Sequence, residues 1–155
     1  MPCYTDDRKW SDQFIPAIKA AIKPILGDSE VAPDEEDKHH NTDLIVLTSE
    51  RGRIACRVRR LEYLNYSDQF TIRASRPSGA RTELQKVVLD GWGDFLFYGF
   101  GENGRLEKWT LADLQIFREY MRSQIRVLKL NPDGVAFRVF DWKKFPPEFQ
   151  VANSI

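Results

Sequence analysis

The chain has 155 residues, with 23 lysines and arginines against 23 aspartates and glutamates, so its formal net charge is zero. A chain of this length buries a hydrophobic core without needing disulfides or structural metals. No apolar run reaches the roughly 20 residues of a membrane-spanning helix, and the amino terminus lacks the pattern of a secretory signal. Cys3 and Cys56 form no disulfide framework, which favours a reducing compartment. We therefore expect a single cytoplasmic domain over residues 1–155, with no membrane partner.

The zero net charge conceals two neighbouring blocks of opposite sign. Residues 28–50 carry eight acids and one lysine, a net charge of −7, and residues 51–81 carry eight arginines, no lysine and two acids, a net charge of +6. Guanidinium groups bind phosphate or carboxylate through two parallel hydrogen bonds and stack on planar groups, which ammonium groups do less well. Two interpretations stay open: the blocks pair with each other on a solvated surface, or the arginines bind a polyanion.

The first predicted element is a helix that Ser11 caps and that Pro24 and Gly27 bring to an end. Its large apolar residues fall at helical spacing, which indicates one buried face: Phe14, Ile15, Ile18, Ile22 and Ile25. Residues 28–42 contain six acids and a proline, and we expect them to form an exposed acidic loop.

Strands follow the loop. Residues 43–48 and 53–59 flank a short turn, which predicts an antiparallel hairpin, and residues 70–73 form a third strand. The remaining elements are a helix at 81–90, a hairpin of 95–100 and 106–109, a helix from 110 to 125, a hairpin of 127–130 and 135–140, and an aromatic, proline-containing tail at 141–155. Thr110 and Asp113 are expected to cap the third helix. This order predicts a mixed α/β fold, with three helices packed on a mixed central sheet and an added C-terminal hairpin.

Arginines recur along the second predicted strand. Because side chains alternate across a strand, Arg53, Ala55, Arg57 and Arg59 share one face, and the residues between them enter the core. A tight turn before this strand places Asp43 opposite residues 58–59. Two readings stay open: a cross-strand ion pair on a solvated sheet face, or a row of guanidiniums that matches a phosphodiester backbone.

In the second reading, two tyrosines beside the row, Tyr63 and Tyr66, stack on bases. The alternative is that they are half-buried anchors of a loop. The candidate nucleic-acid ligands are Arg53, Arg57, Arg59, Arg60, Arg73 and Arg76.

The predicted order of helix, acid at a strand start, hairpin, third strand and helix resembles the core of the PD-(D/E)xK nuclease superfamily. Residues 94–114, a strand pair that runs into a helix, also resemble Holliday-junction-resolvase-like members. This superfamily has an aspartate at a strand start and an acid-x-lysine triplet on the facing strand. Asp43 matches the first position, but the facing triplet reads Cys56-Arg57-Val58 or Arg57-Val58-Arg59 and contains no carboxylate.

Over most of residues 4–120 the chain also resembles a group of small, mostly uncharacterised phage and prophage proteins. This resemblance implies a phage or prophage origin, and hence a bacterial host cytoplasm, but brings little established function. The stretches that carry it are Tyr4-Thr-Asp-Asp-Arg8, Thr42-Asp-Leu44, Arg57-Val-Arg-Arg60, Phe70-Thr-Ile-Arg73, Thr82-Glu-Leu-Gln-Lys86 and Gly91-Trp-Gly-Asp94.

The nuclease resemblance implies Mg²⁺ as the cofactor of an active enzyme, held by two carboxylates and assisted by a lysine. Asp43 is then the metal ligand, and an acid elsewhere, such as Asp12, Glu83 or Asp94, replaces the missing one. Our candidate catalytic set is Asp43 with Glu83 and Lys86. The spacing of the latter two is equally typical of a helix-surface ion pair.

Three functions are therefore compatible with the sequence. The first is binding or processing of nucleic acid, DNA more than RNA, through the arginines, with an incomplete catalytic site. The second is a metal-dependent DNA nuclease or resolvase. The third is a non-enzymatic module that inhibits a host protein, docking a basic partner through the acidic loop or the aromatic tail. The oligomeric state stays open.

Overall fold

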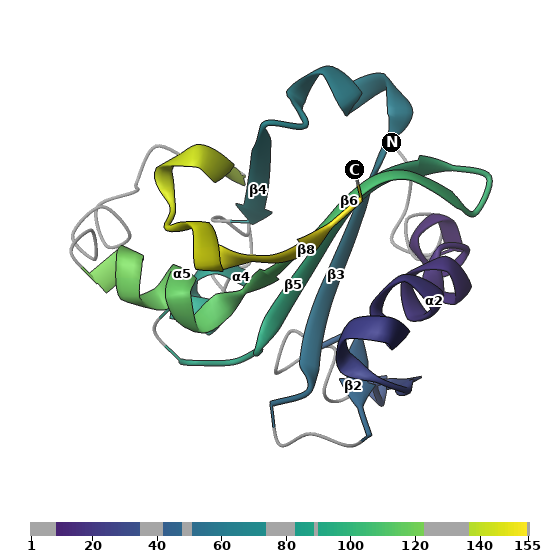
Figure 1. Ribbon diagram of the computed structural model, residues 1–155, viewed down its shortest axis with the longest axis horizontal. Coiled ribbons are helices and arrows are strands. Elements are labelled where there is room, and N and C mark those ends of the chain that lie inside the picture. The colour runs from purple at the N-terminus through teal and green to yellow at the C-terminus, as the bar shows by residue number, and fades with distance from the viewer. Residues whose placement is uncertain are drawn as a thin grey trace.

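The computed structural model describes residues 9–34, 42–47, 51–73, 83–88, 90–122 and 137–154. Its strands form a six-stranded sheet in the order β1-β2-β3-β5-β6-β8 and a two-stranded sheet of β4 and β7 (Figure 1). The main sheet comprises β1 (Ser29–Val31), β2 (Leu44–Val46), β3 (Arg53–Arg60), β5 (Phe95–Glu102), β6 (Arg105–Asp113) and β8 (Gln150–Asn153). Only β3 and β5 run parallel among these neighbours, so the sheet is mixed and the predicted α/β class is confirmed.

The helical elements lie between and beside these strands. They are α2 (Ile15–Leu26), α4 (Glu83–Val88) and α5 (Leu114–Met121), with the 3-10 helices η1 (Leu61–Tyr66), η3 (Trp142–Lys144) and η4 (Pro147–Phe149). Residues 9–12 and residue 34 are also α-helical, so the described residues contain five α-helical segments and the prediction of three is too low. The few described residues of these two additional segments show no helical period from which to predict them.

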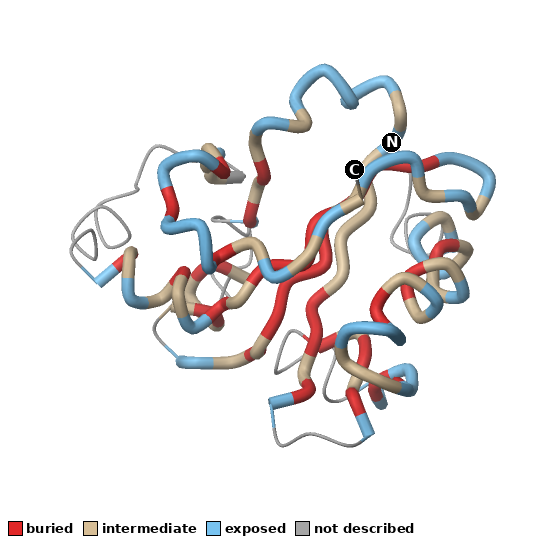
Figure 2. The backbone as a smooth tube through the Cα atoms, in the orientation of Figure 1, coloured by how far each residue is buried: buried red, intermediate tan, exposed pale blue. Residues whose placement is uncertain are grey.

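The main sheet separates two hydrophobic cores, and Figure 2 shows buried residues concentrated along its central strands. One core lies under α2, where Phe14, Ile18 and Ile22 pack with Ile54 and Phe97. The other lies under α4, α5 and the second sheet, on the opposite face. Since strand β5 contributes to both cores, seven of its eight residues are buried.

Helix α2 forms where the apolar spacing predicts it, but its amino terminus differs from the prediction. Ser11 lies in the preceding helical turn and does not cap α2; Phe14 is the N-cap residue and makes no side-chain capping bond. Pro16 near the start of α2 fits there, because the first-turn amides need no intrahelical acceptor. Gly27 ends the helix with a φ of 91°, a conformation that a side chain disfavours.

The hairpin β5–β6 is confirmed and longer than predicted. Asn103 and Gly104 at its tip have φ values of 52° and 75°, the positive values that two-residue hairpin turns require. Gly101 lies at a register shift in this hairpin. A β-carbon at this position would lie 2.3 Å from the carbonyl oxygen of Arg105 and 2.7 Å from the ring of Phe14, so only glycine fits.

The register of the β2–β3 hairpin differs from the prediction. Leu44 pairs with Ile54 and Ile45 pairs with Arg53, so Asp43 lies beside Ala55 and not opposite residues 58–59. The predicted turn is too tight, because pairing ends at Val46, whose amide donates to the carbonyl of Gly52. The carboxyl half of β3 therefore extends beyond β2.

The prediction of an exposed acidic loop over residues 28–42 is wrong for the start of this segment. Residues 29–31 form β1, which pairs antiparallel with β2, and Ser29 and Ala32 are buried. Strand formation by this short segment is determined by the open edge of β2 and by no local pattern. Residues 35–41 lie outside the described residues.

The third predicted strand forms as β4 (Gln69–Arg73), but it pairs antiparallel with β7 (Phe137–Asp141) and not with the main sheet. The predicted 127–130 partner of β7 and Ile125 lie outside the described residues. The aromatic tail packs against the second sheet: its buried aromatic residues lie around Phe70, and its end adds β8 to the main sheet. These residues are Trp142, Phe145 and Phe149.

The predicted capping pair of the third helix is wrong in part. Thr110 and Leu111 belong to strand β6, whereas Asp113 is the N-cap residue of α5 and accepts a hydrogen bond from the amide of Gln115. Leu114, Phe117 and Met121 lie one helical turn apart and are buried. Within the described ranges, no helix is long and apolar enough to cross a membrane.

Candidate functional site

The predicted row of arginines on β3 begins in a part of the strand that helices cover on both faces. Ala55 is buried in the core under α4 and α5, and Ile54 is buried in the core under α2. The alternation of side chains is therefore as predicted, but both faces of β3 are covered at its beginning. A solvated arginine face begins only where β3 extends past this cover.

Arg57 lies in the covered part. Burial lowers the pKa of Arg57, and the nearby Glu83 on α4 opposes that shift, with a smaller contribution of the same sign from Tyr98. The guanidiniums of Arg59 and Arg73 lower the pKa further. The fold thus brings Arg57, Glu83 and Arg73 from β3, α4 and β4 into one charged cluster, with Arg73 on its exposed side.

Asp43, the predicted metal ligand, has a structural partner. Its carboxylate accepts a hydrogen bond of 2.6 Å from the backbone amide of Cys56. This amide lies on β3 just beyond the last pair with β2. The carboxylate therefore takes the place of a main-chain acceptor where β2 is too short to provide one.

The other two candidate catalytic residues lie on α4. Glu83 is the first residue of the helix and Lys86 lies in its last turn, and both are half-buried. The main-chain carbonyl of Lys86 accepts from the amide of Trp92. Nowhere in the described ranges do three or more histidine, cysteine, aspartate or glutamate side chains form a group able to hold a metal ion.

A second ionic cluster joins the start of β5 to the end of β6. Arg51 lies 2.9 Å from the carboxylate of Asp113 and 4.0 Å from that of Asp94. Asp94 also accepts from the amide of Arg53 at 2.9 Å, and Arg118 donates to the carbonyl of Gly93. Burial lowers the pKa of Arg118, against the effect of the two carboxylates. Because these charges bind one another and the backbone, the cluster is structural.

The carboxyl end of β3 presents the remaining arginines beside aromatic rings. The guanidinium of Arg59 lies 4.3 Å from the ring centroid of Tyr63, and that of Arg60 lies 4.7 Å from the ring centroid of Trp10. Tyr66 is 56% exposed. We call these five residues the arginine–aromatic surface.

This surface follows from the chain order. Arg59 and Arg60 are the last two residues of β3 and point to opposite faces of the sheet, so the arginine–aromatic surface lies around the end of this strand and not on one sheet face. Residues of η1 follow directly, and none of the six is buried, so its tyrosines remain near the arginines. Arg73 is exposed at the end of β4. Arg76, the last predicted nucleic-acid ligand, lies outside the described residues.

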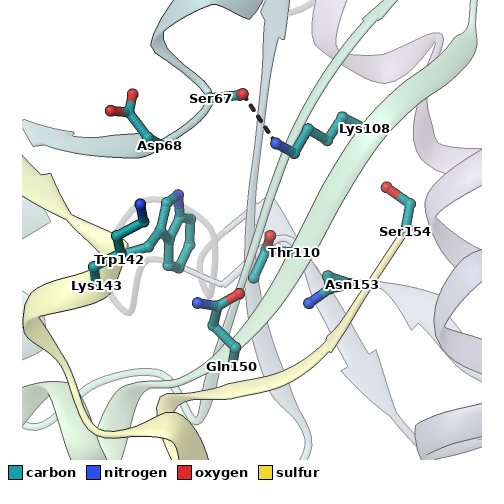
Figure 3. Close-up of a pocket in the computed structure, with 9 residues that line it drawn as sticks. All are labelled: Ser67, Asp68, Lys108, Thr110, Trp142, Lys143, Gln150, Asn153 and Ser154. Carbon is teal, nitrogen blue, oxygen red and sulfur yellow. Dashed lines mark hydrogen bonds between the residues drawn. The ribbon is translucent and has the colours of Figure 1, made fainter.

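A polar cavity of about 400 Å³ opens between η1, β6, η3 and β8 (Figure 3). Lys108 on β6 spans its upper side and donates to the hydroxyl of Ser67 at 3.0 Å. Figure 3 shows Thr110 and Gln150 pointing into the cavity from below, and Trp142 forming a side wall.

None of these cavity residues was predicted from the sequence. They come from four separate elements, and no motif or spacing connects them. The burial of Thr110, a polar residue that is only 7% exposed, marks it as unusual. Burial is a property of the folded chain, however, so it gives no signal in the sequence.

No protein-family model, no curated protein and no solved structure matches this chain.

Proposed function

We propose that this protein binds nucleic acid, single strands in particular, through the arginine–aromatic surface. The observation that carries the proposal is the placement of Arg59 and Arg60 against Tyr63 and Trp10. A ring beneath a guanidinium limits the rotation of the side chain and leaves its N–H groups available to phosphate oxygens. The exposed Tyr66 adds a flat face on which a base of any identity can stack.

Charge at this surface is mixed, which limits the expected affinity. The cavity beside Arg60, about 210 Å³, is lined also by the carboxylates of Glu62 and Glu102. Two arginines that each bind one phosphate release about 1.4 counterions on a single strand, so the affinity should fall with salt at a logarithmic slope of about −1.4 from these residues.

The test is fluorescence anisotropy with labelled 12-nucleotide DNA and RNA strands and the matching duplexes, measured over a range of salt concentrations. The double variant R59Q/R60Q should make the salt dependence weaker, reducing the magnitude of the negative slope by about 1.4, because it removes two phosphate contacts. The variant Y66A should weaken single-strand binding roughly five- to 150-fold, the effect of losing one stacked base.

The matched control is K23Q/R122Q, which removes the same total charge from exposed residues at the ends of α2 and α5. Equal slopes for R59Q/R60Q and this control would show that only net charge matters and would refute the proposed surface. Absence of salt-dependent binding by the unaltered protein would refute nucleic-acid binding altogether.

A metal-dependent nuclease is the second candidate function. What favours it is that Glu83 on α4 lies near Arg57 on β3, so a carboxylate faces the strand whose triplet lacks one. Strand cleavage with Mg²⁺ or Mn²⁺ that is lost in both D43N and E83Q would support this candidate. Activity of these variants equal to that of the unaltered protein would exclude these residues from catalysis.

A relation to the PD-(D/E)xK superfamily and a phage origin remain part of this proposal. In favour of the superfamily stand the order α2, β2, β3, α4 and the position of Asp43 directly before β2. Against it stands the pairing of β4 with β7, which removes the third predicted strand from the main sheet.

A further inference from the structure

The polar cavity beside η1 is rich in hydrogen-bond donors. Lys108 and Lys143 provide two ammonium groups, and Asp68 is the one carboxylate among the residues that line it. Figure 3 shows the carboxylate of Asp68 at the rim, turned away from Lys108. The lining therefore has a net charge of +1 and favours an anion.

The opposite side of the cavity offers a different chemistry. Gln150 and Asn153 on β8 carry amides, which donate and accept hydrogen bonds together, and the hydroxyl of Thr110 does the same. Paired amide donors and acceptors match the edges of nucleobases. Trp142 closes this end with an apolar wall that is fixed in place, since its ring centroid lies 4.3 Å from that of Phe70.

The size and position of the cavity fit one nucleotide of the nucleic-acid strand proposed above as the ligand. A volume of about 400 Å³ lies within the roughly 300–1,000 Å³ that small-ligand pockets occupy. A second cavity, lined by Leu64 of η1, adjoins it, because Ser67, Lys108 and Ser154 line both. The two cavities are therefore neighbours, and the second, which Glu107 also lines, extends the space toward η1.

We infer that this cavity binds one nucleotide, with its phosphate at Lys108 and Lys143 and its base against Trp142 and the amide of Gln150. The identity of the anion as a nucleotide rests on the proposed nucleic-acid function. The nucleotide is either free in solution or an unstacked unit of a bound strand, since both present the same phosphate and base.

Two measurements test this inference. Calorimetry measures the affinity for the free nucleotide AMP and, separately, for its two parts, adenosine and inorganic phosphate. Anisotropy with the 12-nucleotide strand measures the affinity for a strand that could place one unit in the cavity. K108M and Q150M should each weaken binding by roughly tenfold, since each removes one directed polar contact at near-constant side-chain size. The controls are R105M, on the same strand but outside the cavity, and Q115M, on the exposed side of α5.

The outcomes separate the two proposals. Weakening of AMP binding by K108M and Q150M, with no binding of the strand, would support the cavity and refute the proposed function. Weakening of strand binding alone by both variants would support a site for a unit of the strand. Strand binding unchanged in both variants, with no AMP binding, would overturn the cavity inference but leave the proposed function standing. Phosphate binding as tight as AMP would also overturn it, because the base would then make no contact.

Discussion

Replacement of Asp43 separates a structural role of this carboxylate from a catalytic one. The short bond of 2.6 Å from the amide of Cys56 is a hydrogen bond to a charged acceptor, and such bonds contribute about 1.5–3 kcal/mol. D43A leaves this amide without its acceptor, so we expect the free energy of unfolding to fall by about that amount. For a chain of this size the melting temperature should fall by roughly 3–12 °C.

D43N retains an oxygen acceptor of the same geometry. Neutral hydrogen bonds are about half as strong as charge-assisted ones, so we expect D43N to lose only about 1 kcal/mol. A metal ligand behaves differently, because a neutral amide does not replace a carboxylate in holding Mg²⁺. A purely structural Asp43 therefore predicts that any Mg²⁺-dependent strand cleavage by the protein is retained in D43N.

The assay is urea denaturation followed by tryptophan fluorescence. The control is D28A: the Asp28 side chain is 70% exposed and its pair with Lys23 spans 3.5 Å, so its removal should cost less than about 1 kcal/mol. If D43A is as stable as D28A, the carboxylate does not support β3, and the structural interpretation is refuted.

Three further predictions concern the two layers. Urea denaturation of R57M, E83Q and the double variant should give a coupling energy between Arg57 and Glu83 of at least about 0.5 kcal/mol. The reason is that each single change leaves the partner charge uncompensated. Strictly additive losses of stability would contradict the charged cluster. Y98F should lose about 1 kcal/mol, since its hydroxyl lies 3.3 Å from the amide and 3.2 Å from the hydroxyl of Thr71, and a T71V/Y98F cycle should show this coupling. G101A should lose at least roughly 1–3 kcal/mol by thermal unfolding, because its β-carbon would collide with backbone; a neutral G101A would show that the hairpin relaxes freely.

Much of the secondary structure follows from the sequence alone. The apolar spacing of residues 14–25 locates α2, the glycine-flanked residues 101–104 locate a hairpin turn, and β-branched and aromatic runs locate β3, β4 and β5. These predictions hold because they depend on contacts within one turn or one strand pair. The capping errors at Ser11 and Thr110 arise because a hydroxyl residue can equally lie within a helical turn or a strand.

The sheet order depends on contacts between distant segments. No local pattern distinguishes a third strand that joins the main sheet from β4, which pairs with β7 near the other end of the chain. Likewise β1 and β8 are short, and they form because the main sheet has edges with unpaired backbone groups.

The sequence by itself determined the charge blocks, the mixed α/β class and which face of β3 each arginine takes. Only the tertiary structure decided which arginines are covered: α4 and β4 cover Arg57, whereas Arg59 and Arg60 extend past that cover to aromatic rings. It also decided that Lys108, Trp142 and Gln150 share one cavity. The physical reason is that alternation along a strand is local, whereas burial and pocket formation depend on packing between segments far apart in the chain.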